Sequence, residues 1–438
     1  MKTVEEKATV ARKAFLASAG LKTDDKNKAL SAIANALNQK RREVTEANKR
    51  DVEEAMNAET GLKLSDAMLA RLKLSDEKID GMIESVEAVA GLPDPAGRTL
   101  EARELDKDLT LYKVSTPIGV VGFIFESRPD AVPQIASICL KSGNSVVMKG
   151  GSEALNTTKA IYNIVKEASA KAGIPSGWIQ MIESREEVEE MLKLSEHIDL
   201  IIPRGSKKLV KYVQNNTKIP VLGHSDGVCH AYVDREANIE AAVKVCLDAK
   251  TQYPAVCNAI ETLLVDERIA AKFLPKMAAE YSKAGVELRV DDKTHAILRG
   301  FKTKKATERD WSTEYNNLII SIKTVSGVQE AIEHINHYGS HHTDAIMTEN
   351  KETARKFLKQ VDSSSVMHNC STRFADGYRY GLGAEVGIST NKFHARGPVG
   401  LEGMTTYKYI LEGNGQAVAE YIGPNARKYT HRKTNKSW

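Results

Sequence analysis

The sequence predicts an α/β protein built on parallel, doubly wound sheets. Between residues 117 and 203, short apolar strands alternate with segments that have helical spacing. A second alternation of the same kind runs from residue 231 to residue 369. The 438 residues exceed one ordinary domain, so about two or three domains are expected.

The N-terminal ninety or so residues are predicted to be helical. Apolar side chains recur at helical spacing in three stretches: Leu30, Ile33 and Leu37; Met68, Leu69 and Leu72; and Ile79, Met82, Ile83 and Val86. The Pro/Gly-rich string GLPDPAG at 91–97 ends this region. Residues 105–117 then alternate charged and apolar side chains, which predicts extended strands in a hairpin or an arm.

In the first alternating region, strands are expected at 117–125, 144–149, 178–184 and 199–203, with helices at 131–143, 154–173 and 186–196. Ligands of such sheets bind beyond the carboxyl ends of the strands. The loops after residues 124, 148 and 202 are therefore the ones expected to bind a ligand. In the second region, a helix is expected at 239–250 and strands at 231–234, 261–267, 288–292, 317–324, 344–349 and 364–369.

The charge balance argues against a nucleic-acid partner. The chain has 62 Lys and Arg against 58 Asp and Glu, a formal net charge of +4. Basic residues gather only near the end of the sequence, at Arg427, Lys428, Arg432, Lys433 and Lys436. A solvated tail or a subunit-contact arm is favoured there over a polyanion site.

Five cysteines without a CxxC pair or zinc-ligand spacing indicate a reducing compartment, and no metal site is predicted. The N-terminal segment contains acidic residues and no continuous apolar run, so neither a signal peptide nor a membrane span is expected. The predicted location is the cytoplasm.

The string TQYPAVCNAIETLLVDE at 251–267 is the most informative for chemistry. It places Cys257 in a polar loop directly ahead of an expected strand, after Pro254. A thiol on such a loop is better placed to react than one in a core, although it needs a helix end, a cation or dehydration to become a thiolate. On composition alone a buried, inert cysteine is the commoner outcome, and Cys139, Cys229 and Cys246 keep that interpretation.

Two loops of the first region have weak anion-binding features. Lys149 stands at the carboxyl end of an expected strand and precedes two glycines, so it could approach a phosphate or a ribose. Arg204, Gly205 and Ser206 end another strand and start a helix, whose free amides suit a pyrophosphate. No G-x-G-x-x-G loop follows a strand, and neither a Walker-type string nor HExxH is present, so conventional Rossmann binding loses support.

Together these strings resemble the aldehyde dehydrogenase superfamily, which binds its cofactor without a G-x-G-x-x-G loop. Within it they are most similar to the glutamate-5-semialdehyde dehydrogenases, or gamma-glutamyl phosphate reductases, of proline biosynthesis. The resemblance covers essentially the whole chain and rests on PIGVVGFIFESRPD, VVMKGGSEA, PRGS, YPAVCNAIETLLV and STNKFHARGPVGLEGMTTYKY. It implies two doubly wound α/β domains and a small β oligomerisation element.

The resemblance assigns roles residue by residue. It makes Cys257 the nucleophile and Lys149 the lysine that binds the adenosine ribose. Gly205 and Ser206 would bind the pyrophosphate, and Glu385 the nicotinamide ribose. Ser152 stands where many NAD-preferring relatives have a glutamate, so room remains for a 2′-phosphate and NADP (NADPH) is favoured.

Two departures from ordinary aldehyde dehydrogenases bear on mechanism. The glutamate that activates hydrolytic water falls near Gly223, and residues 219–234 contain no glutamate, which favours exchange of the thioester with phosphate. Arg128 stands where the superfamily has an oxyanion-hole asparagine, and either a catalytic guanidinium or an ordinary ion pair fits it. Ser127, His394 and Arg396 are candidates for binding the substrate's α-amino and α-carboxylate ends.

The resemblance therefore implies NADPH-dependent reduction of L-glutamyl 5-phosphate through a Cys257 thioester, by a homo-oligomer, with glutamate 5-kinase as a candidate partner. Expected domains are residues 1–228 for the cofactor, 229–403 for catalysis and 404–438 for oligomerisation, with 100–115 contributing to an arm. Two alternatives stay open. One is an acylating dehydrogenase that uses coenzyme A, and the other is an inactive scaffold or RNA-binding module, which the modest charge disfavours.

Overall fold

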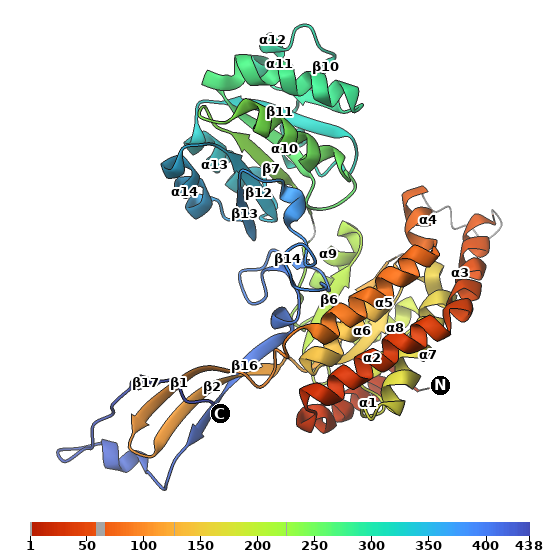
Figure 1. The fold of residues 1–438 in the computed structure, drawn as a ribbon, viewed down its shortest axis with the longest axis vertical. Helices are drawn as coiled ribbons and strands as arrows, with labels where there is room; N and C mark the ends of the chain where they lie inside the picture. The colour runs from red at the N-terminus through yellow and green to blue at the C-terminus, as the bar shows by residue number, and fades with distance from the viewer. Residues whose placement is uncertain (1, 58–65, 127, 225) are drawn as a thin grey trace. The chain divides into compact units, whose positions relative to one another are not determined.

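The computed structural model describes residues 2–57, 66–126, 128–224 and 226–438. Its chain forms two compact units (Figure 1). Unit 1 comprises residues 1–222, 382–387 and 399–438, and unit 2 comprises residues 223–381 and 388–398. No helix among the described residues has both the length and the apolar character needed to span a bilayer.

Unit 1 contains a four-stranded parallel sheet in the order β5-β4-β3-β6. Its strands are β3 (Val120–Phe125), β4 (Ser145–Lys149), β5 (Ile179–Met181) and β6 (Leu200–Arg204). The strands are buried on both faces, which explains why they are continuous apolar runs in the sequence. All four strands expected in the first alternating region are confirmed.

Helices cover both faces of this sheet. On one face, α1 (Val4–Ala17) and α8 (Arg185–Met191) pack against apolar side chains of β3, β4 and β6. The remaining helices of the unit are α2 (Thr23–Gln39), α3 (Arg41–Met56), α4 (Asp66–Leu72), α5 (Asp76–Gly91), α6 (Ala131–Ser142), α7 (Leu155–Lys171) and α9 (Lys207–Asn215). Helix α2 contacts α5, α6 and α7, so the expected helical N-terminal region is confirmed.

A buried carboxylate fixes the start of α7, the helix that follows the predicted cofactor loop. Asp51 of α3 accepts hydrogen bonds from the backbone nitrogens of Asn156 (3.0 Å) and Thr157 (2.7 Å). These amides lie in the first turn of α7, where a negative charge is favoured by unpaired N–H groups and by the helix dipole. The helix start, and with it the loop after β4, is thereby anchored.

An antiparallel sheet in unit 1 joins distant parts of the sequence in the order β16-β2-β1-β17 (Figure 1). Its strands are β1 (Thr99–Asp106), β2 (Leu109–Pro117), β16 (Thr405–Glu412) and β17 (Arg432–Thr434). The hairpin of β1 and β2 confirms the extended segment predicted at 105–117. Pairing of β1 with β17 places part of the basic C-terminal segment in this sheet.

Unit 2 contains a seven-stranded, all-parallel sheet in the order β10-β9-β11-β8-β7-β12-β13. The strands are β7 (Cys229–Val233), β8 (Ile260–Asp266), β9 (Glu287–Val290), β10 (Thr303–Lys305), β11 (Ile319–Val325), β12 (Thr343–Met347) and β13 (Ser365–His368). Only the short β10 was not expected. A further pair, β14 (Ile388–Ser389) and β15 (Gly397–Pro398), is antiparallel.

Helices pack on both faces of this sheet and form a separate apolar core on each face, as in a doubly wound fold. One contains Phe273 and Leu274 of α11 (Glu267–Lys283) and Cys246 of α10 (Ile239–Thr251). The other joins Ile332 of α13 (Val328–Tyr338) and Phe357 of α14 (Lys351–Gln360) to the central strands. The short α12 (Asp292–Ile297) packs beside α11.

Candidate active site

Cys257 lies on the turn between α10 and β8, with its side chain partly exposed. Cys139, Cys229 and Cys246 are buried, as predicted, and burial raises the pKa of each thiol. Cys370 is partly buried. Cys257 therefore meets the accessibility that a nucleophile requires, in the loop position that the sequence predicted.

The backbone of Cys257 is in direct contact with Gly227, in the segment that leads into β7. A Cβ on Gly227 would lie 2.2 Å from the carbonyl oxygen of Cys257 and 2.4 Å from its Cα. The Gly227 amide donates to Oε1 of Glu314 at 3.0 Å, and burial raises the pKa of that carboxyl. Only glycine therefore allows this approach, which sets the position of the cysteine loop.

Asn258, the residue after the cysteine, is held by two side-chain hydrogen bonds. Asn258 is buried, donates to the carbonyl of Ala375 at 2.8 Å and accepts a hydrogen bond from the guanidinium of Arg373. Burial lowers the pKa of Arg373, and negative charge on Cys257 acts in the opposite direction. Arg373 is thus a cation that contacts the residue directly after Cys257. Sequence reasoning missed it, because nothing in STRF at 371–374 marks it as functional.

A buried ion pair lies between the two elements that flank the cysteine turn. Nζ of Lys250, at the end of α10, is 2.5 Å from Oε2 of Glu261 in β8, and both side chains are fully buried. Burial raises the pKa of Glu261 to about 7 and lowers the pKa of Lys250. The pair ties the end of the helix to the start of the strand.

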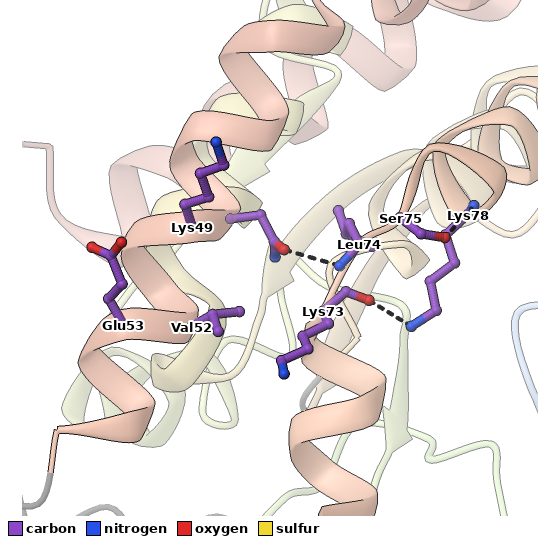
Figure 2. Close-up of a pocket in the computed structure, with 8 residues that line it drawn as sticks. Lys49, Val52, Glu53, Lys73, Leu74, Ser75 and Lys78 are labelled. Carbon is purple, nitrogen blue, oxygen red and sulfur yellow. Dashed lines mark hydrogen bonds between the residues drawn. The ribbon is translucent and has the colours of Figure 1, made fainter.

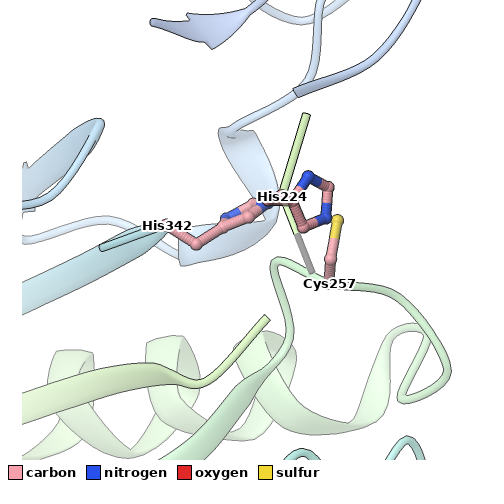
Figure 3. Close-up of side chains that lie close together, drawn as sticks. All are labelled: His224, Cys257 and His342. Atoms are coloured by element: carbon pink, nitrogen blue, oxygen red, sulfur yellow. The ribbon is translucent and has the colours of Figure 1, made fainter. Parts of the chain in front are cut away.

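Strand order explains which other residues meet Cys257. β8, β7 and β12 are neighbours in a parallel sheet, so the segments before them reach the same amino edge. Cys257 precedes β8, His224 precedes β7 and His342 directly precedes β12. One ligand atom from each lies within 4.8 Å of the others (Figure 3). Sequence reasoning gave His224 no catalytic role and did not single out His342.

The string GHSDG at 223–227 has the Gly-x-Ser-x-Gly spacing of a nucleophile elbow, which sequence reasoning also missed. An elbow turns sharply from a strand into a helix. Here the string leads into strand β7, and Ser225 itself lies outside the described residues. The context of a serine hydrolase is therefore not met.

In unit 1, the predicted cofactor residues follow three adjacent strands. Lys149 ends β4, and Ser152 is exposed three residues later. Gly205 and Ser206 follow β6, and Arg128, half-buried, follows β3. Because β4, β3 and β6 are parallel neighbours, these loops lie at one carboxyl edge. The loops expected to bind a ligand are thus brought together.

Lys149 is nearly buried at this edge. Burial lowers the pKa of its ammonium group, and the charges of Glu153 and Glu126 oppose that shift. A Cβ on Gly150 would lie 2.9 Å from the Thr158 hydroxyl, so the chain after Lys149 runs close against α7. A lysine held in this way presents a fixed cation to a ligand at the strand end.

The N-terminus of α9 already binds a carboxylate. Ser206 caps the helix, its backbone nitrogen donates to Oε2 of Glu126 at 2.6 Å, and its hydroxyl donates to Oε1 at 3.3 Å. Glu126 directly follows β3. The free amides and the positive end of a helix suit an anion. The helix start predicted to bind a pyrophosphate therefore has the affinity for negative charge that this role needs.

The other predicted residues lie as follows. Glu385 is half-buried in unit 1, two residues before Gly387, whose added Cβ would lie 3.9 Å from Ile202 of β6. In unit 2, His394 is exposed and Arg396 forms an ion pair with Asp362 at 3.0 Å. Ser127 lies outside the described residues.

A separate hollow of about 560 Å³ lies between α3 and the segment that joins α4 to α5 (Figure 2). Within it, Leu74 donates its amide to Asn48 at 2.9 Å, and Lys78 donates to the carbonyl of Lys73 at 2.6 Å. Its lining contains none of the predicted site residues. The hollow is therefore not assigned to the reaction.

Comparison with known proteins identifies the family of this chain. The model of the aldehyde dehydrogenase family matches residues 1–297. A gamma-glutamyl phosphate reductase of Methanococcoides burtonii is 57% identical over 98% of this chain and 97% of its own. The chain belongs to the gamma-glutamyl phosphate reductases of the aldehyde dehydrogenase family.

Solved structures of the family share the fold. The crystal structure of gamma-glutamyl phosphate reductase from Thermotoga maritima has 44% identity and a TM-score of 0.91, covering 95% of this chain and 100% of that one. An acetylating aldehyde dehydrogenase from Geobacillus thermoglucosidasius has 19% identity and a TM-score of 0.66, covering 94% of this chain and 97% of its own. The second likeness concerns the fold alone. The predicted aldehyde dehydrogenase-like architecture is confirmed.

Proposed function

We propose that this oxidoreductase catalyses the NADPH-dependent reduction of L-glutamyl 5-phosphate to L-glutamate 5-semialdehyde, with release of phosphate, in proline biosynthesis. The observation that carries the proposal is a partly exposed Cys257 thiol on a loop fixed by Gly227 and by Asn258, which accepts a hydrogen bond from Arg373. The near relatives are named for the phosphate they reduce.

In the proposed mechanism, the Cys257 thiolate attacks the acyl carbon of the substrate. The carbon–phosphate oxygen bond breaks and inorganic phosphate leaves with the bonding electrons, so a thioester remains on the enzyme. NADPH, when bound, supplies the hydride that reduces this thioester. The resulting hemithioacetal oxyanion expels the Cys257 thiolate and releases the aldehyde. Arg128 and the Cys257 backbone amide are assigned to the oxyanion.

The residues at the carboxyl edge of β4, β3 and β6 fit a dinucleotide. Lys149 would bind the adenosine ribose, Gly205 and Ser206 the pyrophosphate, and Glu385 the nicotinamide ribose. The α9 N-terminus supports this assignment, because it already binds the carboxylate of Glu126 where the pyrophosphate would bind. The exposed Ser152 leaves room for a 2′-phosphate, so NADP is the proposed cofactor.

In the oxidative direction, the thioester is proposed to react with phosphate and not with water, because the described residues around it offer no free glutamate as a hydrolytic base. Residues 219–234 supply no glutamate as a hydrolytic base. Of the carboxylates near the cysteine loop, Glu261 is held by Lys250 and Glu314 by the Gly227 amide. Ser127, His394 and Arg396 are proposed to bind the α-amino and α-carboxylate ends, and Arg396 would exchange its bond to Asp362 for the substrate.

We further propose that residues 1–228 bind the cofactor, residues 229–403 carry catalysis, and residues 404–438 with 100–115 form an oligomerisation element. The antiparallel sheet that joins β1 and β2 to β16 and β17 supports the last assignment. A homo-oligomer in the cytoplasm, with glutamate 5-kinase as a candidate partner, completes the proposal.

The test is run in the oxidative direction. With the semialdehyde and NADP, reduction of NADP should require added phosphate and should be insensitive to coenzyme A. Cys257→Ser should abolish it, whereas Cys370→Ser, which changes another partly buried thiol of unit 2, should not. A reaction driven by coenzyme A would establish the acylating alternative. Phosphate-independent turnover would establish hydrolysis.

A further inference from the structure

The cluster of His224, Cys257 and His342 has the composition of a metal site. One ligand atom from each side chain lies within 4.8 Å of the others, and the two imidazole rings are in edge contact at 4.7 Å between centroids. Figure 3 shows the three side chains converging from the separate segments that precede β7, β8 and β12. Thiolate and imidazole are the ligands that Zn²⁺ prefers.

The hydrogen bonds of His224 leave one nitrogen for a ligand. Its Nδ1 lies 2.8 Å from the carbonyl oxygen of Ile388, which only accepts, so Nδ1 carries the proton and Nε2 has a lone pair. A metal-bound histidine typically donates its other ring N–H to a carbonyl or carboxylate, which fixes the ring and raises its basicity. The ring of His224 is thus held through Nδ1 by a carbonyl, as in a metal-bound histidine, and Nε2 is available to coordinate a metal.

His342 supplies an independent sign of a missing partner. The residue is fully buried, and its Nδ1 lies 2.9 Å from the Thr343 hydroxyl. Its Nε2 is buried without a hydrogen-bond partner among the residues that the structure describes. A buried polar atom left unpaired costs about 1–3 kcal/mol. A cation coordinated by this nitrogen would satisfy it.

We propose that Zn²⁺ binds to Cys257, His224 and His342 and thereby switches the nucleophile off reversibly. With Zn–S of about 2.3 Å and Zn–N of about 2.0 Å, tetrahedral ligand atoms lie roughly 3.3–3.6 Å apart, so the cluster contracts by about 1 Å on binding. The thiol proton passes to solvent, and the sulfur lone pair that would attack the acyl carbon is held by the metal. Three protein ligands leave the fourth position to water.

The test uses the full-length protein without substrate, so its outcome does not depend on the proposed reaction. Titration with Co²⁺ should give one equivalent of binding and a sulfur-to-metal charge-transfer band in the near ultraviolet. Cys257→Ser should abolish the band, and Cys370→Ser should leave it unchanged. Zn²⁺ should displace Co²⁺, and it should protect Cys257 from iodoacetamide while Cys370 continues to react.

Two histidine variants test the other ligands. His342→Asn and His224→Asn each keep a polar group near the Nδ1 position and lose Nε2. Each should weaken Zn²⁺ binding at least about 100-fold, since even partners of ligands typically contribute 10–100-fold. If thermal unfolding shows that His342→Asn does not fold, the Zn²⁺ affinity of His224→Asn decides the question, because His224 is partly exposed and its replacement disturbs the core less. A band that persists in Cys257→Ser, or unchanged Zn²⁺ affinity in the folded histidine variants, would mean adventitious binding and overturn the proposal.

Discussion

The contact between Gly227 and Cys257 gives a sharp test of how the nucleophile is positioned. In Gly227→Ala the new methyl group would lie 2.2 Å from the Cys257 carbonyl oxygen, whereas ordinary contact begins near 3.4 Å. The opposing atoms are backbone, so no side chain can rotate away, and the cysteine loop must move by about 1 Å. A misplacement of about 1 Å typically costs about 10²-fold in rate. We expect kcat to fall by about that factor.

The measurement combines turnover with the rate at which iodoacetamide alkylates Cys257, in a Cys370→Ser background with one accessible thiol. Gly300→Ala is the matched control, because a Cβ there has no atom within 4 Å and the φ of Gly300 does not lie in the left-handed region. Thermal unfolding shows whether Gly227→Ala remains folded. A folded Gly227→Ala with the turnover and alkylation rate of Gly300→Ala would refute the role of this contact.

Four further substitutions address the remaining features. Arg128→Ala should lower turnover by about 10²–10³-fold with NADPH binding unchanged by fluorescence titration; equal turnover would remove Arg128 from the mechanism. Ser152→Glu should shift preference from NADP toward NAD in kcat/KM, because a carboxylate repels the 2′-phosphate, and an unchanged ratio would contradict the assignment. Glu126→Gln should lower the KM for NADPH, since it removes the anion that competes for the α9 N-terminus; a higher KM would show that Glu126 assists binding. Lys250→Met should cost about 3–5 kcal/mol in urea unfolding, and adding Glu261→Gln should recover most of it. No recovery would mean that the loss comes from packing.

The fold could be predicted because its strands are short, apolar and regularly spaced between helices. Buried parallel strands such as β3 and β4 leave continuous apolar runs, which are easily recognised. The short β10, β14, β15 and β17 were missed, because two or three residues carry no periodic signal. Their pairing depends on distant segments of the chain.

Site residues could be predicted only where the neighbouring residues in the sequence form a recognisable motif. Cys257 and Lys149 lie in such strings, and the structure places each on the loop expected. Arg373 and His342 approach the cysteine loop from segments about 85 to 115 residues further along the chain, so only the tertiary fold brings them there. Gly227 was equally invisible, since its function is the absence of a side chain at one contact.

The functional loops of unit 1 follow the carboxyl ends of their strands, whereas Cys257 of unit 2 precedes the amino end of its strand, so the neighbouring helices offer opposite ends of their dipoles. The loops of unit 1 lie at carboxyl ends, where α9 offers the positive end of a helix to an anion. Cys257 lies before β8 and after the C-terminus of α10, which is the negative end of that helix, so the dipole of α10 does not favour an anion there. Lys250, the cation in the last turn of α10, is already paired with Glu261. A cation from another segment is therefore needed beside the thiol, and we propose Arg373 for this role, because its guanidinium donates a hydrogen bond to Asn258, the residue after Cys257.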